Sequence, residues 1–218
     1  MIINAGQFAI LGIGAFALTG LLTWPVRALA IRLGAMDAPN MARKTQTEPV
    51  PYLGGVAIAL GITLITFAAV FVGGNKSGEN TSQLKDLALT VLLPALILGA
   101  MGLMDDLRSL SPWPRLITQS LVGSVVAFVI VQGGTIGTPF GTTALNTAIT
   151  IFWIVGMCNS INFFDNLDGA ASGAVAIAAL GVFFIAFDRG QELVSALSIV
   201  TAGATIGFLL WNKSPAKI

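Results

Sequence analysis

The chain has no histidine among its 218 residues, and it has a single cysteine, Cys158. Without histidine, these residues cannot supply a Ser-His or Cys-His nucleophile, a histidine-ligated metal or a histidine proton relay. One cysteine cannot form an internal disulfide, and because Cys158 lies in an apolar run we interpret it as a packing residue. Carboxylates, amides, hydroxyls and cations are therefore the groups available for chemistry.

Charged residues are also scarce, at 10% of the chain, whereas 55% of the residues are hydrophobic and the mean hydropathy is +0.86. This composition excludes an ordinary soluble domain. The apolar runs are continuous rather than alternating, which favours helices of about 20 residues over a β-barrel. We predict an all-α, polytopic protein, a single integral membrane domain over residues 1–218. About seven spans are expected, at 7–24, 52–72, 87–104, 116–132, 147–163, 170–187 and 193–211.

The distribution of positive charge predicts how these spans are oriented. No basic segment precedes the first span, which is therefore not a cleavable signal, and basic residues follow it. With the N-terminus outside, eight of the eleven Lys and Arg residues lie inside, as the positive-inside rule expects. The inner residues are Arg27, Arg32, Arg43, Lys44, Arg108, Arg115, Lys213 and Lys217. The same orientation places two acidic clusters on the cytoplasmic face.

Small residues recur four positions apart within the spans, as in Gly169 with Gly173 and Gly203 with Gly207. Such spacings predict close approach of helices in lipid. The segment GIGAFA at 12–17 half-matches a dinucleotide-binding fingerprint, but no strand precedes it and it lies inside a span. We interpret it as a packing segment as well.

The first acidic cluster is the segment MGLMDDLRS, in which Asp105 and Asp106 directly follow the third span. A helix C-terminus disfavours anions, two adjacent carboxylates repel, and the membrane border makes their desolvation costly. The pair is either the solvated start of a loop, or a cation site or catalytic carboxylates. We favour the functional interpretation because nothing local rewards this arrangement.

The second cluster surrounds the segment INFFDNLDG, where Asn159, Asn162, Asp165 and Asp168 are each three residues apart. In a continuous helix they would follow one stripe, although turn-forming residues favour a break near residue 165. Asp168 alone could simply cap the sixth span. Four oxygen-bearing side chains at one membrane border suit a hard divalent cation, with Mg²⁺ expected and Mn²⁺ as the alternative.

A third polar segment, RKTQTEPVPYLGG, precedes and opens the second span. Its Arg43 and Lys44 suit phosphate, whereas the alternative is that they only attract anionic lipid. Gly54 and Gly55 would let backbone or ligand approach closely. The three segments together predict a cytoplasmic site with carboxylates, a divalent metal, basic groups and a hydrophobic wall.

These segments, in this order on a polytopic chain, resemble glycosyltransferase family 4, the polyprenyl-phosphate N-acetylhexosamine-1-phosphate transferases. The matching stretches are DAPNMARKTQTEPVPYLGG, GLMDDLRSLSPWPRLITQ and NSINFFDNLDGAASG, and they look more like the GlcNAc-type branch than phospho-MurNAc-pentapeptide transferase. The resemblance implies Mg²⁺-dependent transfer of a sugar 1-phosphate from a UDP-N-acetylhexosamine, such as UDP-GlcNAc, to undecaprenyl or decaprenyl phosphate. UMP would be released, and the product would serve cell-wall or surface-polysaccharide synthesis.

The resemblance also implies a multi-pass protein of the cell membrane whose active site faces the cytoplasm, with no nucleic-acid partner and with homodimerisation left open. It makes Asp105 and Asp106 the catalytic pair, with Asp105 the better match for the residue that engages the lipid phosphate. Asn162 matches the amide that helps to hold Mg²⁺. The residues expected to bind substrate are Lys44, Gly54, Gly55, Arg115, Asn159, Asp165 and Asp168.

The sequence departs from the family at two places. Gln46 stands where the family's loop often has a histidine. The chain ends at WNKSPAKI, where relatives continue into a Met-Gly-Asp motif whose aspartate is a metal ligand. The resemblance therefore implies a C-terminally truncated chain, the N-terminal part of a larger transferase domain, and we expect it to be inactive alone.

Three other functions stay open at the level of sequence. An ion-coupled membrane transporter would use acidic residues and broken helices within the bilayer. An intramembrane aspartyl protease would use paired acids that share a proton, also within the bilayer. Here the acids lie at the borders of the spans, which favours neither; a non-catalytic membrane scaffold is the third alternative.

Overall fold

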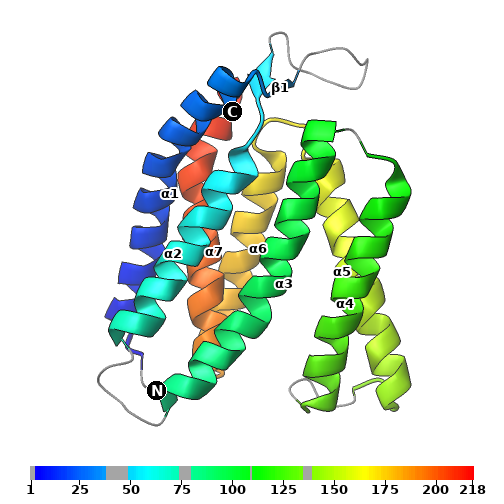
Figure 1. Cartoon of the computed structure of the whole chain (residues 1–218). Coiled ribbons are helices and arrows are strands. Elements are labelled where there is room, and N and C mark those ends of the chain that lie inside the picture. Colours follow the sequence, from blue (N-terminus) through cyan, green and yellow to red (C-terminus); the bar gives the residue numbers. More distant parts are fainter. Residues whose placement is uncertain (1–2, 38–48, 74–79, 109, 135–138) are drawn as a thin grey trace. The chain divides into compact units, whose positions relative to one another are not determined.

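In the computed structural model, the residues described are 3–37, 49–73, 80–108, 110–134 and 139–218. They form seven helices and a short antiparallel sheet (Figure 1). The helices are α1 (Ala5–Leu33), α2 (Gly54–Gly73), α3 (Asn80–Arg108), α4 (Pro112–Gln132), α5 (Thr143–Phe164), α6 (Ala170–Asp188) and α7 (Glu192–Asn212). Among the described residues, six helices are long and apolar enough to cross a membrane, and the apolar part of α2, Gly54–Val70, is shorter. The prediction of an all-α, multi-pass membrane protein is confirmed.

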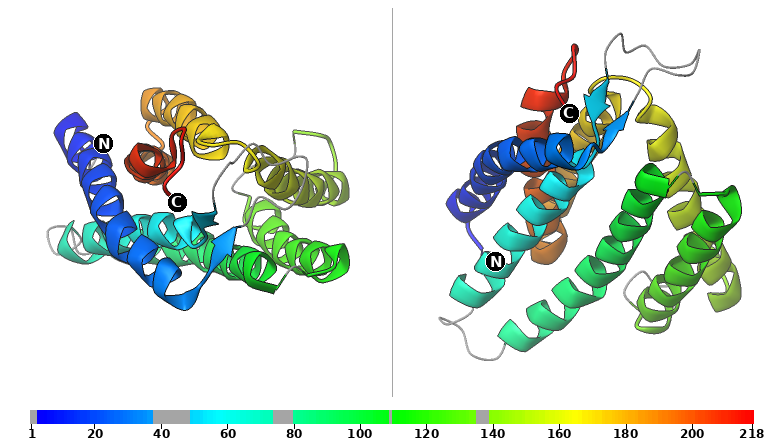
Figure 2. Two further views of the ribbon diagram at one scale, coloured as in Figure 1. Left: turned by 90° about the horizontal axis from the view of Figure 1, so that it is seen from above. Right: turned by 45° about the horizontal axis from the view of Figure 1, so that its top comes forward.

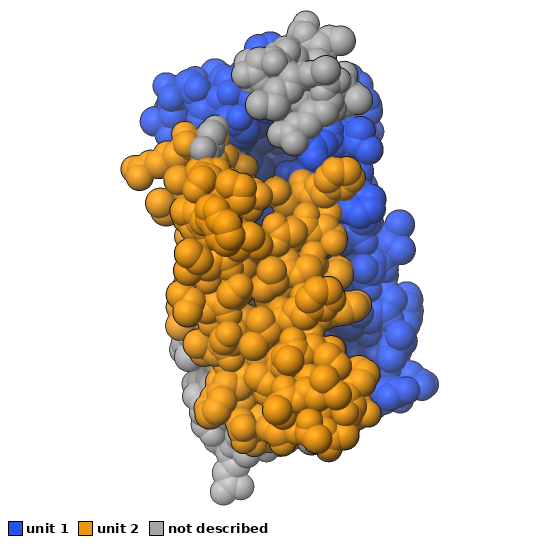
Figure 3. All heavy atoms as spheres, turned by 90° about the vertical axis from the view of Figure 1, so that its right-hand side faces the viewer, with its two compact units in different colours: residues 1–88, 164–218 blue, residues 89–163 orange. Residues whose placement is uncertain are grey.

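The chain divides into two compact units, which Figure 3 shows in different colours. Unit 1 contains Met1–Ala88 and Phe164–Ile218, and unit 2 contains Leu89–Phe163. Helices α1, α2, α6 and α7 therefore belong to unit 1. Unit 2 consists of most of α3 together with α4 and α5.

In unit 1, α7 packs against α1, α2 and α6 (Figures 1 and 2). Glycine makes the close approach to α1 possible, because a Cβ at Gly203 would collide with the backbone of Gly12, and a Cβ at Gly207 with the backbone of Phe16. The packing role predicted from these spacings is confirmed for Gly203 and Gly207. At Gly173, by contrast, a Cβ would meet no described atom within 4 Å.

Helix α1 continues beyond residue 24, where the sequence predicted its end. Pro25 lies inside the helix, which ends at Gly34 in the left-handed conformation, φ 67°. Proline removes only its own N–H donor from the helical ladder, and the buried residues Val26 and Ala30 extend the inner stripe of α1 past it. Burial on that stripe thus carries the helix through the proline, and the predicted end of the first helix at residue 24 is nine residues too early.

A two-stranded sheet lies between the C-terminal end of α1 and the N-terminal start of α2. Strand β1 (Met36–Asp37) pairs antiparallel with β2 (Val50–Pro51), with Met36 opposite Pro51. Helix α5 ends at Phe164 and α6 begins at Ala170, so the predicted break near residue 165 is confirmed. The turn between α5 and α6 carries two of the predicted site residues, Asp165 and Asp168.

In unit 2, α4 turns one face toward α5. Its buried residues are Gln119, Gly123, Ala127 and Val131, each four positions from the next. Many apolar side chains elsewhere in the unit are exposed, for example Phe152 at 78% and Trp153 at 65%. Such a surface suits contact with lipid rather than water.

Candidate active site

The predicted catalytic pair lies in the last turn of α3, in unit 2. Oδ2 of Asp105 accepts a 2.7 Å hydrogen bond from Nη1 of Arg115, which lies in the first turn of α4. The two side chains therefore form an ion pair. The two side chains are only 16% and 26% exposed. Since the end of α3 disfavours an anion, the guanidinium supplies the compensation that the helix does not.

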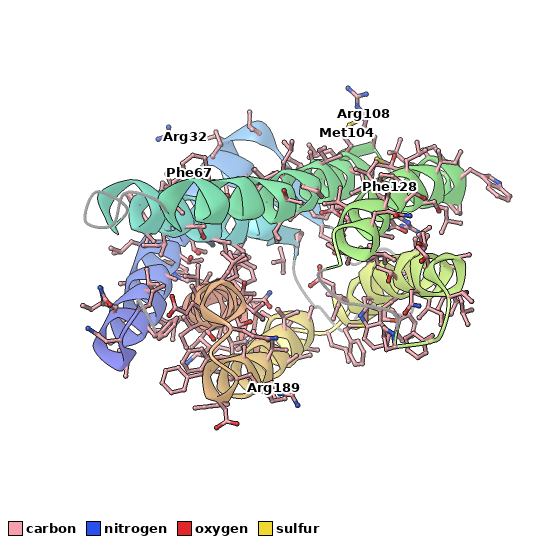
Figure 4. The ribbon with its side chains drawn as sticks, turned by 90° about the horizontal axis from the view of Figure 1, so that it is seen from below. Arg32, Phe67, Met104, Arg108, Phe128 and Arg189 are labelled. Atoms are coloured by element: carbon pink, nitrogen blue, oxygen red, sulfur yellow. The ribbon has the colours of Figure 1, made fainter. Side chains whose placement is uncertain are left out.

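The other charged residues in the last turn of α3 are more exposed than Asp105. Asp106 is exposed, and Arg108 extends outward from the end of α3 (Figure 4). Nε of Arg115 is buried and has no hydrogen-bond partner within the described part of the chain. Arg115 thus holds Asp105 with one nitrogen and has a second donor that the surrounding protein does not use.

The amides of the second cluster lie on α5. Asn159 donates through Nδ2 to Oε1 of Gln119 on α4, at 2.7 Å, and to the carbonyl oxygen of Val155, at 2.8 Å. Asn162, near the end of α5, is exposed. The sequence reasoning missed Gln119; the available signal was a polar residue four positions before Gly123, in an otherwise apolar stripe.

The turn between α5 and α6, in unit 1, carries the two remaining acids. Asp168 does not cap α6, because Gly169 occupies the N-cap position with φ 72°. Oδ2 of Asp168 instead accepts a hydrogen bond from the backbone N–H of Ala216, at 3.0 Å. The alternative of a helix-capping aspartate is therefore wrong, and the carboxylate holds the segment after α7.

Asp165 belongs to the turn after α5 and lies near a second carboxylate. Desolvation of its carboxyl group by burial and the nearby Asp37 carboxylate, in that order, raise the pKa of Asp165 above its usual value. Asp37, at the end of β1, accepts a hydrogen bond from the hydroxyl of Tyr52, at 3.0 Å. Asp37 belongs to the first quoted family segment, and its proximity to Asp165 is a feature that sequence reasoning did not assign.

Asn212, at the end of α7, connects the same turn to the segment that follows. Its Oδ1 accepts from the backbone N–H of Gly169 and from the hydroxyl of Ser172, both at 3.1 Å, and its Nδ2 donates to the carbonyl oxygen of Ile218, at 2.8 Å. An open, mostly apolar depression lies beside this contact. It is lined by Asp168, Gly169, Ala170, Ile206, Leu209, Leu210, Lys213 and Ser214.

The paired glycines at the start of α2 differ in how closely other residues pack against them. A Cβ at Gly54 would lie 2.5 Å from Cζ of Phe208 on α7, whereas one at Gly55 would meet no described atom within 4 Å. Gly54 therefore has a packing role in unit 1, and its contact with substrate stays a prediction. Lys44, like Arg43 and Gln46, lies outside the described residues.

The predicted site residues thus form two groups. In unit 2, Asp105 pairs with Arg115 and Asn159 with Gln119; in unit 1, Asp165 and Asp168 lie in one turn. The described ranges contain no group of three or more His, Cys, Asp and Glu side chains that could hold a metal ion. Asp106 and Asn162 have the oxygen donors that Mg²⁺ prefers, so the donor chemistry fits while the full ligand set stays a prediction.

Comparison with known proteins gives matches over most of the chain. The chain is 32% identical over 207 residues to a protein of Bacillus subtilis named "Probable undecaprenyl-phosphate N-acetylglucosaminyl 1-phosphate transferase", covering 92% of this chain and 54% of that relative. It is 30% identical to the decaprenyl-phosphate N-acetylglucosaminephosphotransferase of Mycobacterium tuberculosis, covering 97% and 55%. A phospho-N-acetylmuramoyl-pentapeptide-transferase of Streptococcus thermophilus is 27% identical, covering 96% and 65%.

The extent of these matches and a family model complete the comparison. The chain spans about half the length of the first two relatives. The family model described as glycosyl transferase family 4 matches residues 88–218, a stretch that includes both the Asp105–Arg115 and the Gln119–Asn159 contacts. With three motif segments in family order and this match over more than half of its length, the chain belongs to glycosyltransferase family 4.

Proposed function

We propose that this chain carries the acidic part of a phosphotransferase site that moves a sugar 1-phosphate from a UDP-N-acetylhexosamine to a polyprenyl phosphate. UDP-GlcNAc is the preferred donor in this proposal because the two relatives with the highest identity reported above are named for N-acetylglucosamine. The names of the matched relatives give no support to a membrane transporter. The observation that carries the proposal is the partly buried Asp105–Arg115 pair inside the segment that matches the family.

The chemistry requires two anions to meet. An oxygen of the lipid phosphate attacks the β-phosphorus of the nucleotide, the bond from that phosphorus to the bridging oxygen breaks, and UMP leaves with the electron pair. A phosphate monoester is already largely ionised near neutral pH, because its second pKa is about 6, so a general base is not needed. Neutralising and positioning the reactants is then the main task of the site.

The residues of unit 2 suit this task. Arg115 holds the Asp105 carboxylate in one place and keeps a buried Nε donor that a phosphate oxygen could accept. Asp106 and Asn162 are the exposed oxygen donors that would hold a divalent cation. Mg²⁺, when bound, would supply positive charge to the diphosphate.

The proposal places the site at the cytoplasmic face of the cell membrane. The positive-inside count supports this orientation, since eight of the eleven basic residues fall in the predicted inner segments. The donor nucleotide is a soluble anion, whereas the acceptor is anchored in lipid by its polyprenyl tail. A border site where Asp105 and Asp106 lie in the last turn of an apolar helix would give access to both.

The decisive experiment measures sugar transfer in two proteins reconstituted in lipid nanodiscs with Mg²⁺, UDP-GlcNAc and undecaprenyl phosphate. The first is this chain, which we expect to be inactive alone. The second joins this chain to the part of the Bacillus subtilis relative that it does not match. We expect the joined protein to release UMP and form the lipid-linked product, and its Asp105→Asn variant to lose at least about a hundredfold in rate.

Exposed Ser124 of α4 offers a matched control, because Ser124→Ala removes a hydroxyl whose one hydrogen bond within the described residues is to the Ser120 carbonyl oxygen of its own helix. That variant should keep the transfer rate of the joined protein. A joined protein that is folded and inserted but forms no lipid-linked product would overturn the proposed function. Transfer by this chain alone would support the function and refute the expectation of inactivity.

A further inference from the structure

The buried face of α4 contains one polar residue among small and apolar ones. Gln119 heads the stripe that continues with Gly123, Ala127 and Val131, and it is only 7% exposed. One turn further along α4, Gly123 faces α5, where a Cβ would make an ordinary contact of 3.5 Å with Cγ2 of Ile154. A buried amide at a close helix contact must find a hydrogen-bond partner.

That partner is Asn159 of α5. Its Nδ2 donates to Oε1 of Gln119 at 2.7 Å and to the carbonyl oxygen of Val155 at 2.8 Å. An amide nitrogen carries two hydrogens, so both donors of Asn159 are engaged. The orientation of the amide is not arbitrary, because the Val155 carbonyl can only accept; a flipped amide would set oxygen against oxygen.

We infer that Gln119 is a positioning residue that holds Asn159 as a pure acceptor. With both N–H groups engaged, Oδ1 is the atom of the Asn159 side chain that remains for a ligand. Its partner must be electropositive, either an N–H or O–H group of a sugar nucleotide or a divalent cation. The identity of this ligand rests on the proposed function, whereas the held orientation of Asn159 rests only on the two hydrogen bonds.

The orientation can be tested on the 218-residue chain itself, in nanodiscs, with ¹⁵N-labelled asparagine. The side-chain amide signal of Asn159 is identified by its loss in Asn159→Asp. We expect its two protons to be protected from solvent exchange, and Gln119→Leu to remove the protection of one. Exposed Asn162, three residues further along the same helix, is the internal control for an unprotected amide.

The role in binding is tested with two probes added separately, UDP-GlcNAc without metal and diamagnetic Mg²⁺ without nucleotide. The probe that faces Oδ1 should shift or broaden the Asn159 signal, and Gln119→Leu should weaken its binding by about 10–100-fold, the usual effect of losing a residue that orients a ligand. Gln119→Glu should bind nearly as well as the wild type, because a carboxylate also accepts from Nδ2. Ser124→Ala should bind like the wild type.

The outcomes separate this inference from the proposed function. If Asn159 exchanges as freely as Asn162 in the wild type, or if Gln119→Leu lowers thermal stability without changing exchange or binding, the positioning role is wrong. If the amide protons are protected but neither probe binds, the held orientation stands and the proposed ligand class fails.

Discussion

At the scale of single residues, the neighbourhood of Asp165 is unfavourable for a negative charge. Burial desolvates its carboxyl group and Asp37 adds a like charge, so the pKa of Asp165 is raised in the folded chain. An unfolded aspartate has a pKa of about 3.9. The folded state thus binds the proton more tightly than the unfolded state, and the stabilisation that this gives is complete at low pH and is lost as pH rises through the raised pKa.

We therefore predict that Asp165→Asn raises the thermal unfolding temperature at pH 7 but not below about pH 3, where aspartate is largely protonated in both states. The difference should grow with pH between the unfolded pKa and the raised folded pKa. Thermal unfolding in detergent across that range measures it. A variant that is equally stabilised at every pH, or destabilised at pH 7, would contradict this account of Asp165.

The ion pair between Arg115 and Asp105 gives a second prediction for single residues. Arg115→Gln leaves a largely buried carboxylate without its cation, which should lower the free energy of unfolding by about 2 kcal/mol. Arg115→Gln,Asp105→Asn removes both charges and should recover much of that stability. A double variant whose loss of stability equals the sum of the losses in the two single variants would show that the pair is not coupled.

The transfer rate of the joined protein should stay low in both Arg115→Gln and the double variant, because the proposed site has lost Arg115.

At the scale of elements, the contact between α1 and α7 depends on two glycines. Gly207→Ala places a Cβ against the backbone of Phe16, which cannot move like a side chain, so it should lower the free energy of unfolding by about 1–3 kcal/mol. Gly173→Ala on α6 is the matched control, since its Cβ would meet no described atom within 4 Å and alanine favours a helix over glycine by about 1 kcal/mol. Urea or thermal unfolding should show a lower free energy of unfolding than the wild type for Gly207→Ala and a higher one for Gly173→Ala. Equal losses of stability in the two variants would refute the close contact between α1 and α7.

The helices themselves could be predicted from the sequence, because a bilayer demands long apolar runs and the chain has them. The end of α1 could not, since the burial of Val26 with Ala57 of α2 and Phe208 of α7 outweighs the local signal of Pro25. The role of Asp168 was missed for a related reason. Its partner Ala216 is 48 residues away, and no local pattern shows such a contact. Motif segments thus supply the predicted site residues, while the pairing of Gln119 with Asn159 and of Asn212 with Gly169 emerges from the fold.

At the scale of the whole molecule, the number of helices that cross the membrane decides which residues share a side. If the N-terminus is outside, as predicted, and α1 through α7 all cross the membrane, Arg32 and Arg108 face the cytoplasm and Arg189 faces outside. If the shorter α2 does not cross, Arg32 and Arg108 lie on opposite sides, because only α3 then separates them. These three arginines are exposed, and Figure 4 marks their positions on α1, on α3 and just after α6.

The scarcity of cysteine makes this test direct. In a Cys158→Ser background, each of Arg32, Arg108 and Arg189 is replaced in turn by cysteine, and intact cells are treated with a membrane-impermeant maleimide. We expect Arg189→Cys to react in intact cells, and Arg32→Cys and Arg108→Cys to react only after permeabilisation. Labelling of Arg108→Cys in intact cells would place Asp105 and Asp106 outside, away from the cytoplasmic supply of nucleotide sugars. That single result would refute the orientation on which the proposed transfer depends.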